Sequence, residues 1–274
     1  MGQDLNVSVE NKGSKGSSVF ASLTIVICIV IGALLWKFVM GAPANFVKGD
    51  PNGQPLPGNY LGMVFKGGMI VPVLMGLLLM TIVFSVERFI VLKKAAGKGN
   101  LDIFVKGVLS QIKTGDVQGA IAACDEQEGS VANVIKAGLL KSEQVKKDGL
   151  DVDTATENIT KEVEQATSLE MPMLEKHLTI ISTLVSIGTL LGLLGTVSGM
   201  IKAFAGLAEG TPDQAELANG ISEALINTAT GISTSTLAVI AYNYFTSKID
   251  TLTYFIDEAG FAISQAYKRA KGSN

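Results

Sequence analysis

The stretch LTIISTLVSIGTLLGLLGTVSGM, residues 178–200, contains no charged side chain. A helix needs about 20 apolar residues to cross the hydrocarbon core of a bilayer, so this stretch predicts a membrane-spanning helix. Three other stretches meet the same requirement, and one of them carries a single charged residue, Glu223, near its start. They are SSVFASLTIVICIVIGALLW (17–36), GGMIVPVLMGLLLMTIVFSV (67–86) and residues 221–247. The expected fold is therefore an all-α integral membrane protein with four transmembrane helices.

The composition supports this class. Of 274 residues, 47% are hydrophobic and 17% are charged, whereas an ordinary soluble protein has about 25% charged residues. The mean hydropathy is +0.38 and the formal charge is −3, which gives no indication of a nucleic-acid surface. Two distant cysteines and one histidine exclude a disulfide framework and two-histidine metal sites. No nucleophile–base pair, phosphate loop or metal-ligand set is present, so an enzyme is the least favoured class and no cofactor is expected.

Lysine and arginine concentrate after the second and fourth apolar stretches, which places those ends in the cytoplasm by the positive-inside rule. The residues concerned are Arg88, Lys93, Lys94, Lys98, Lys248, Lys268, Arg269 and Lys271. The connection 205–217 contains neither residue type and is expected outside. Parity then places the 41–66 loop outside and the N-terminus inside.

The first apolar stretch has two interpretations. Small residues, GAPA at 41–44, follow it as they follow the core of a cleaved signal peptide. The stretch is longer than a typical signal core, however, and it ends in Trp36 and Lys37, an interfacial anchor pair. We therefore expect a retained N-terminal anchor, with a cleaved signal peptide as the alternative.

The polar region 88–177 contains 12 Lys or Arg and 14 Asp or Glu, a balance typical of solvated helices. Helical spacing predicts a helix that ends at Gly115, with Asp116 and Ser130 capping the next two helices. From about residue 154 a polar helix is expected to lead straight towards the third span, with a kink at Pro172. The region is expected to form helical stalks that extend the membrane helices.

Two sets of polar side chains mark the third and fourth spans. In the third span a hydroxyl recurs every seven residues and so returns to nearly the same face of the helix. These residues are Ser182, Thr189 and Thr196, with Gly192, Gly195 and Gly199 beside them as close-packing positions. In the fourth span a carboxylate, an amide and four hydroxyls occupy one broad sector. They are Glu223, Asn227, Thr230 and Thr234, bordered by Thr228 and Ser235.

Hydroxyls in membrane helices commonly bond carbonyls of their own helix, and this is the default for Ser222, Ser233 and Thr236. It does not explain Glu223, because a carboxylate costs up to a few kcal/mol to insert and so favours a place in an ion path. No Asp, Arg or His lies in the centre of a span, so a second titratable group must come from a partner. The one imidazole, His177, precedes the third span, where a structural role is favoured over a ligand or pH-sensing role.

The paired segments LTIISTLVSIGTLLGLLGTVSGMIKAF and GISEALINTATGISTSTLAVIAYNYF resemble the signature helices of the MotA/TolQ/ExbB proton-channel family, and within it the ExbB branch. VERFIVL (86–92) and GDVQGAIAACDEQEGSVANVIKAGL (115–139) also match, so the resemblance covers about residues 67–250. It implies that Thr196 and Thr228 are pore threonines and that Glu223 is the family glutamate. The chain departs from the family where Thr189 and Leu237 replace prolines. Because added hydroxyls can also coordinate sodium, the implied ion is H⁺, with Na⁺ as the alternative.

The resemblance further implies a homopentamer in the bacterial inner membrane, with a dimer of ExbD-like single-span subunits in the pore supplying a membrane aspartate. Proton flow would then drive a TonB-like protein that energises outer-membrane import. A TolQ-like envelope subunit, a motility stator and a non-conducting scaffold are the alternatives. No nucleic-acid partner is expected.

The expected organisation follows from the spans and the resemblance. It comprises a cytoplasmic tail (1–16), an extra N-terminal anchor (17–40), a periplasmic loop (41–66), a transmembrane helix (67–87), a cytoplasmic helical region (88–177), a pore-lining helix (178–204), a periplasmic loop (205–217), a second pore-lining helix (218–247) and a cytoplasmic C-terminal helix or tail (248–274).

Overall fold

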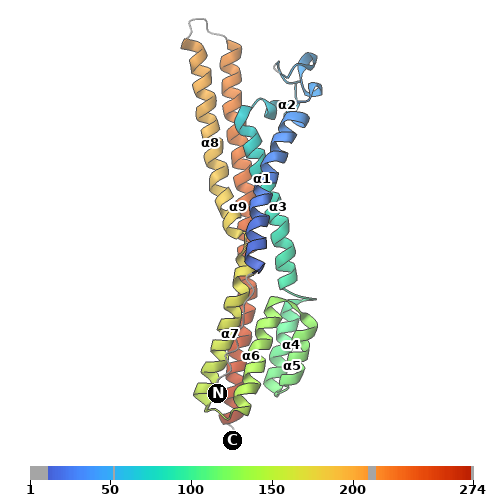
Figure 1. Ribbon diagram of the computed structural model, residues 1–274, viewed down its shortest axis with the longest axis vertical. Helices are drawn as coiled ribbons and strands as arrows, with labels where there is room; N and C mark the ends of the chain where they lie inside the picture. The colour runs from blue at the N-terminus through green and yellow to red at the C-terminus, as the bar shows by residue number, and fades with distance from the viewer. Residues whose placement is uncertain (1–11, 52, 209–213, 273–274) are drawn as a thin grey trace. The chain divides into compact units, whose positions relative to one another are not determined.

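The computed structural model describes residues 12–51, 53–208 and 214–272 (Figure 1). Within these residues all regular secondary structure is helical, and the only β-type pairing is an isolated bridge between Phe46 and Pro55. The α-helices are α1 (Lys12–Leu34), α2 (Tyr60–Phe65), α3 (Val71–Ala95), α4 (Leu101–Thr114), α5 (Val117–Gln127), α6 (Gly129–Lys147), α7 (Val152–Glu175), α8 (Leu178–Ala208) and α9 (Gln214–Gly272). The all-α fold class is confirmed.

Among the described residues, four helical stretches are long and apolar enough to cross a membrane. They are Ala21–Met40, Gly68–Ala95, Val152–Ala205 and Glu216–Lys271. Each overlaps one of the predicted spans, so the protein is a multi-pass membrane protein. The first stretch includes a π-helical turn at Leu35–Met40 that continues α1.

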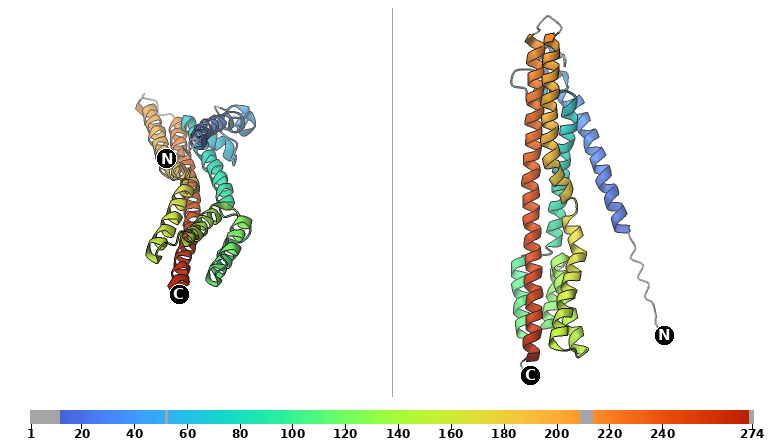
Figure 2. Two further views of the ribbon diagram at one scale, coloured as in Figure 1. Left: turned by 60° about the horizontal axis from the view of Figure 1, so that its bottom comes forward. Right: turned by 90° about the vertical axis from the view of Figure 1, so that its left-hand side faces the viewer.

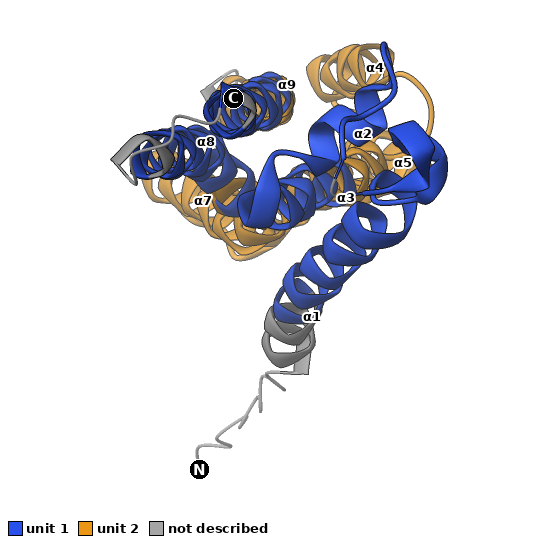
Figure 3. Ribbon diagram, turned by 90° about the horizontal axis from the view of Figure 1, so that it is seen from above, with its two compact units in different colours: residues 1–84, 180–240 blue, residues 85–179, 241–274 orange. Residues whose placement is uncertain are grey.

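The chain divides into two compact units (Figure 3). Unit 1 comprises Met1–Phe84 and Ile180–Ile240, and unit 2 comprises Ser85–Thr179 and Ala241–Asn274. The predicted spans therefore fall largely in unit 1, and the predicted cytoplasmic region falls in unit 2.

In unit 1, α8 and the first part of α9 run side by side (Figures 1 and 2). Glycines make the approach close. A Cβ added to Gly192 would lie 3.2 Å from the Cα of Gly231, and one added to Gly199 would lie 2.8 Å from the carbonyl oxygen of Gly220. The predicted close-packing role of the third-span glycines is confirmed, because no larger residue fits without moving backbone.

The N-terminal helix α1 also packs closely, in its case against α3. A Cβ on Gly32 would lie 2.7 Å from the backbone nitrogen of Gly76. Beyond α1, the buried Asn45 side chain donates to the carbonyl oxygens of Val39 and Met40. Trp36 stacks on Phe65 with ring centroids 4.7 Å apart. The described part of the 41–66 loop is thus a packed connection rather than a loose one.

Unit 2 is built from amphipathic helices that bury one face each. Val131, Val134, Ile135 and Leu139 of α6 are buried, as are Ile159 of α7 and Ile256 and Ile263 of α9. Two predicted helix boundaries are confirmed, since Gly115 ends α4 in the left-handed conformation and the Asp116 side chain caps α5. Ser130 is not a cap. Helix α6 begins at Gly129, and its N-cap position is Glu128, two residues before Ser130. Glu128 adopts a positive φ of 56°, which turns the chain there.

The helices are longer than the predicted spans. Helix α8 runs to Ala208 and α9 begins at Gln214, so both extend into the segment 205–217 expected as a loop. Helix α9 also continues past residue 247 to Gly272 without a break. Its sequence contains neither glycine nor proline between residues 232 and 259, and nothing in it interrupts the helical hydrogen bonds.

The expected direct run of the polar helix into the third span is wrong. Helix α7 ends at Glu175 and α8 begins at Leu178, and His177 between them has a φ of +63°. A non-glycine residue in the left-handed conformation stops a right-handed helix. Pro172, the expected site of a kink, lies inside α7.

Candidate functional site

The hydroxyl groups of Thr196 on α8 and Thr228 on α9 form a hydrogen bond with each other. The Thr228 hydroxyl also lies 3.2 Å from the carbonyl oxygen of Ala224 and 3.3 Å from that of Gly192. The Thr196 hydroxyl lies 3.3 Å from the same Gly192 oxygen. The two residues that the resemblance identified as pore threonines therefore face each other across α8 and α9 and share an acceptor.

Glu223, on α9, forms an ion pair with Lys202 of α8. The Lys202 Nζ lies 2.6 Å from the Glu223 Oε1, with side-chain exposures of 56% and 14%. On its other side the carboxylate meets Gly68, whose φ is +76° and where an added Cβ would lie 2.4 Å from Oε1. The sequence identified Glu223 but did not give it a partner within the chain.

Lower on the same two helices, Thr189 donates a hydrogen bond of 2.9 Å to the Ser235 hydroxyl. Two further predicted residues, Thr230 and Thr234, donate to the carbonyl oxygens four residues earlier in α9. Ser182 lies half-buried on α8. Ser233 and Thr236 bond carbonyls of their own helix, as expected for them.

Asn227 is fully buried, and neither polar atom of its side chain has a hydrogen-bond partner among the described residues. A Cβ added to Gly195 would clash with the Asn227 side chain, so the amide packs directly against this glycine of α8. Thr234 is likewise fully buried, and Ser235 is 7% exposed. Three of the secondary pore-lining candidates therefore do not reach the surface of the chain, because close helix packing covers this side of α9.

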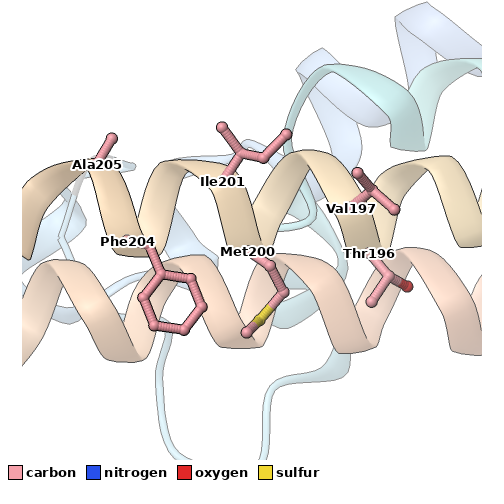
Figure 4. A pocket seen from close by; sticks show the side chains of 6 residues that line it. All are labelled: Thr196, Val197, Met200, Ile201, Phe204 and Ala205. Carbon is pink, nitrogen blue, oxygen red and sulfur yellow. The ribbon is translucent and has the colours of Figure 1, made fainter.

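The upper part of α8 carries an open apolar hollow (Figure 4). Its lining residues all belong to α8 and are Thr196, Val197, Met200, Ile201, Phe204 and Ala205. Apart from the Thr196 hydroxyl, the hollow offers no polar side chain. It suits an apolar neighbour rather than a polar ligand.

Unit 2 contains an ionic cluster of Glu87, Arg88 and His177 that the sequence analysis did not predict. Arg88, 1% exposed, donates to the Glu87 Oε2 at 2.6 Å and to the carbonyl oxygens of Met173 and Leu174 at 3.1 and 3.2 Å. His177 Nδ1 lies 3.2 Å from the same Glu87 oxygen. Arg88 thus satisfies carbonyls at the end of α7 that the helix itself leaves free.

No group of His, Cys, Asp or Glu within the described ranges could hold a metal ion. Both cysteines are free and buried. Burial raises the pKa of the Cys124 thiol to about 12, so it stays a neutral thiol at physiological pH.

The part of the chain that matches a known protein family includes this site. A family model described as the MotA/TolQ/ExbB proton channel family matches residues 126–258. The Tol-Pal system protein TolQ of Pseudomonas aeruginosa is 34% identical over 57% of this chain and 69% of its own length. The putative biopolymer transport protein ExbB-like 3 of Synechocystis is 32% identical over 39% of this chain and 52% of its own length. The biopolymer transport protein ExbB of Pseudomonas putida is 25% identical over 53% of this chain and 44% of its own length. The chain thus spans between 44% and 69% of these curated relatives.

Proposed function

Since the chain belongs to the MotA/TolQ/ExbB proton channel family, we propose that it is the ExbB-like subunit of a motor driven by the proton-motive force in the bacterial inner membrane. The observation that carries this proposal is the hydrogen bond between Thr196 and Thr228. Hydroxyls that face each other between two membrane helices can pass a proton along hydrogen bonds. The family is a proton-channel family and not a class of enzymes.

The acid of the relay comes from a partner. The predicted spans 17–36, 67–86, 178–200 and 221–247 contain no aspartate, and Glu223 is paired with Lys202 of α8. An ExbD-like subunit with one span and a membrane aspartate, present as a dimer, supplies the missing titratable group. A proton path usually needs such a second group.

Five copies of the chain surround that dimer. Six exposed large apolar residues on α8 recur at alternating steps of three and four, the spacing of a helix-packing seam, and the exposed Leu193 lies beside them. The six residues are Ile187, Leu190, Leu194, Val197, Ile201 and Phe204. This seam supports a helix of another subunit lying along α8, and the apolar hollow beside Thr196 belongs to the same region.

The N-terminal helix is a retained anchor in this proposal. The contact between Gly32 and Gly76 and the stacking of Trp36 on Phe65 support it, because they make α1 part of unit 1. An intact mass that includes the first 44 residues is expected; loss of that segment would show cleavage.

A TonB-like protein takes up the work in the first candidate function, and outer-membrane import depends on it. A TolQ-like role in envelope maintenance is the second candidate, favoured by the relative from Pseudomonas aeruginosa, which this chain covers more fully than the ExbB of Pseudomonas putida.

A deletion strain separates these candidates. We expect loss of energised uptake of a large outer-membrane substrate, restored by the wild-type gene and not by a Thr196→Val, Thr228→Val double variant. Intact uptake together with detergent sensitivity and leakage of periplasmic proteins would reject the ExbB-like role and support the TolQ-like one. Wild-type behaviour in both assays would reject both.

A further inference from the structure

We propose that Lys202 makes the path selective for protons, because its ammonium group occupies the position at Glu223 that a metal cation such as Na⁺ would need. This inference rests on the proposed ion-conducting function and names the residue that decides which ion is conducted. Lys202 was not among the site residues expected from the sequence.

The Oε1 atom of Glu223 is already bonded to the ammonium group of Lys202. The Lys202 Nζ is 2.6 Å from this oxygen, the distance of a charge-assisted hydrogen bond. Gly68 also lies close to this oxygen, since a Cβ added to Gly68 would clash with Oε1. The carboxylate is only 14% exposed. A metal cation that binds Oε1 would therefore have to displace the ammonium group.

The neighbouring hydroxyls are also committed. Na⁺ gives up its hydration shell only for a set of oxygen ligands that replace it. Thr196 and Thr228 bond each other and helix carbonyls, and the Thr189 hydroxyl donates to Ser235. Of the added hydroxyls that made Na⁺ an alternative, Thr189 and Ser235 pair between α8 and α9. Those of Ser233, Thr234 and Thr236 donate to carbonyl oxygens of α9. A proton needs no ligand shell and can follow such pairs.

Removing the ammonium group should open a cation position. In Lys202→Met the Glu223 carboxylate keeps its position and its burial but loses the Lys202 ammonium group. A cation from solution can then bind the unpaired carboxylate. In Lys202→Arg a side-chain cation remains. In Lys202→Met with Glu223→Gln neither charge remains. These three variants separate the effect of the cation from a general effect of altering the site.

The first test uses the purified full chain in detergent and needs no partner. Thermal unfolding is measured in NaCl and in choline chloride at equal ionic strength. Wild type and Lys202→Arg should melt at the same temperature in both salts. Lys202→Met should melt about 2–4 °C higher in NaCl, because a bound ion stabilises the folded state. The double variant should lose this difference. Equal melting of Lys202→Met in both salts, or Na⁺-specific stabilisation of wild type, overturns the inference.

The second test measures ion flux in membrane vesicles that contain the chain together with its partner subunit. Wild-type proton flux should be the same in Na⁺ and choline media, and the flux of Lys202→Met should depend on Na⁺. A wild-type complex that conducts no ion at all refutes the proposed function, while the melting experiment still decides whether Lys202 blocks a cation position. A wild-type complex driven by a Na⁺ gradient refutes the selectivity and leaves the conducting function intact.

Discussion

The hydroxyls of Thr196 and Thr228 share the carbonyl oxygen of Gly192 as an acceptor, so the fold should tolerate the loss of either hydroxyl. A proton path between them, in contrast, needs both. In Thr196→Val, the Thr228 hydroxyl keeps the carbonyl oxygens of Ala224 and Gly192 as acceptors. We expect a loss of only about 1 kcal/mol in the free energy of unfolding.

Energised transport should nevertheless fall strongly in Thr196→Val, because valine keeps the shape and removes the hydroxyl. Thr196→Ser keeps the hydroxyl and serves as the matched control. Transport that is equal in the valine and serine variants would reduce Thr196 to a packing residue.

Glu223 could be recognised from the sequence because a carboxylate in an apolar span is costly. Its partner could not. Pairing Lys202 with Glu223 requires the register of two antiparallel helices, which local periodicity does not contain. The structure supplies it: seven residues separate Thr189 from Thr196 on α8, and seven separate Ser235 from Thr228 on α9. A further step of seven on each helix would bring residue 203 opposite residue 221, and Lys202 and Glu223 lie one and two residues short of these positions.

At the scale of elements, the contact between α8 and α9 depends on glycines. A Cβ on Gly231 would lie 2.5 Å from the carbonyl oxygen of Gly188, a backbone atom that cannot rotate away. We expect Gly231→Ala to destabilise the protein by about 1–3 kcal/mol, the usual cost of overpacking.

Gly107, inside α4, is the control for this substitution because nothing lies within 4 Å of its added Cβ. Gly107→Ala should stabilise by about 0.5–1 kcal/mol through helix propensity. Both variants are compared by thermal unfolding in the same detergent. A destabilisation of equal size in the two would mean that the approach of α8 to α9 is not what makes Gly231 necessary.

The break between α7 and α8 depends on Arg88. Arg88→Met leaves Glu87 without its cation and leaves the carbonyl oxygens of Met173 and Leu174 without their donor. Removing one member of a buried pair costs about 3–5 kcal/mol, so the melting temperature should fall markedly.

Lys106→Met removes an exposed pair with Asp102 and should leave the melting temperature unchanged. If Arg88→Met melts like Lys106→Met, the buried cluster does not hold the end of α7.

Composition and apolar length predict the four spans, because both are properties of a continuous stretch. The end of α7 could not be predicted in this way. It depends on His177 in the left-handed conformation and on Arg88, which lies some 85 residues away in the sequence. The continuation of α9 past residue 247 could be read from the absence of glycine and proline between residues 232 and 259. The predicted boundary at residue 247 instead follows the start of the charged residues.

At the scale of the whole molecule, the membrane topology can be tested with single cysteines. The native Cys28 and Cys124 are buried, and the raised pKa of Cys124 keeps it a thiol, so both should be silent towards a maleimide at pH 7. Glu216→Cys is exposed at the start of α9 and should react with an impermeant reagent on spheroplasts.

Lys106→Cys, at an exposed position on α4, should react only after lysis. Labelling of Lys106→Cys in intact spheroplasts would place unit 2 outside and reverse the topology. Labelling of neither position in intact spheroplasts would place the start of α9 on the same side as α4.

The central claim is that this chain conducts protons through the Thr196–Thr228 region only together with a partner that supplies an acid. Proton flux into liposomes, driven by a potential and followed with a pH-sensitive dye, tests it most directly. We predict flux from the complex with the single-span subunit, little or none from this chain alone, and little or none from the complex with the Thr196→Val, Thr228→Val chain. Robust flux from the chain alone, or undiminished flux from the double-valine complex, would contradict the claim.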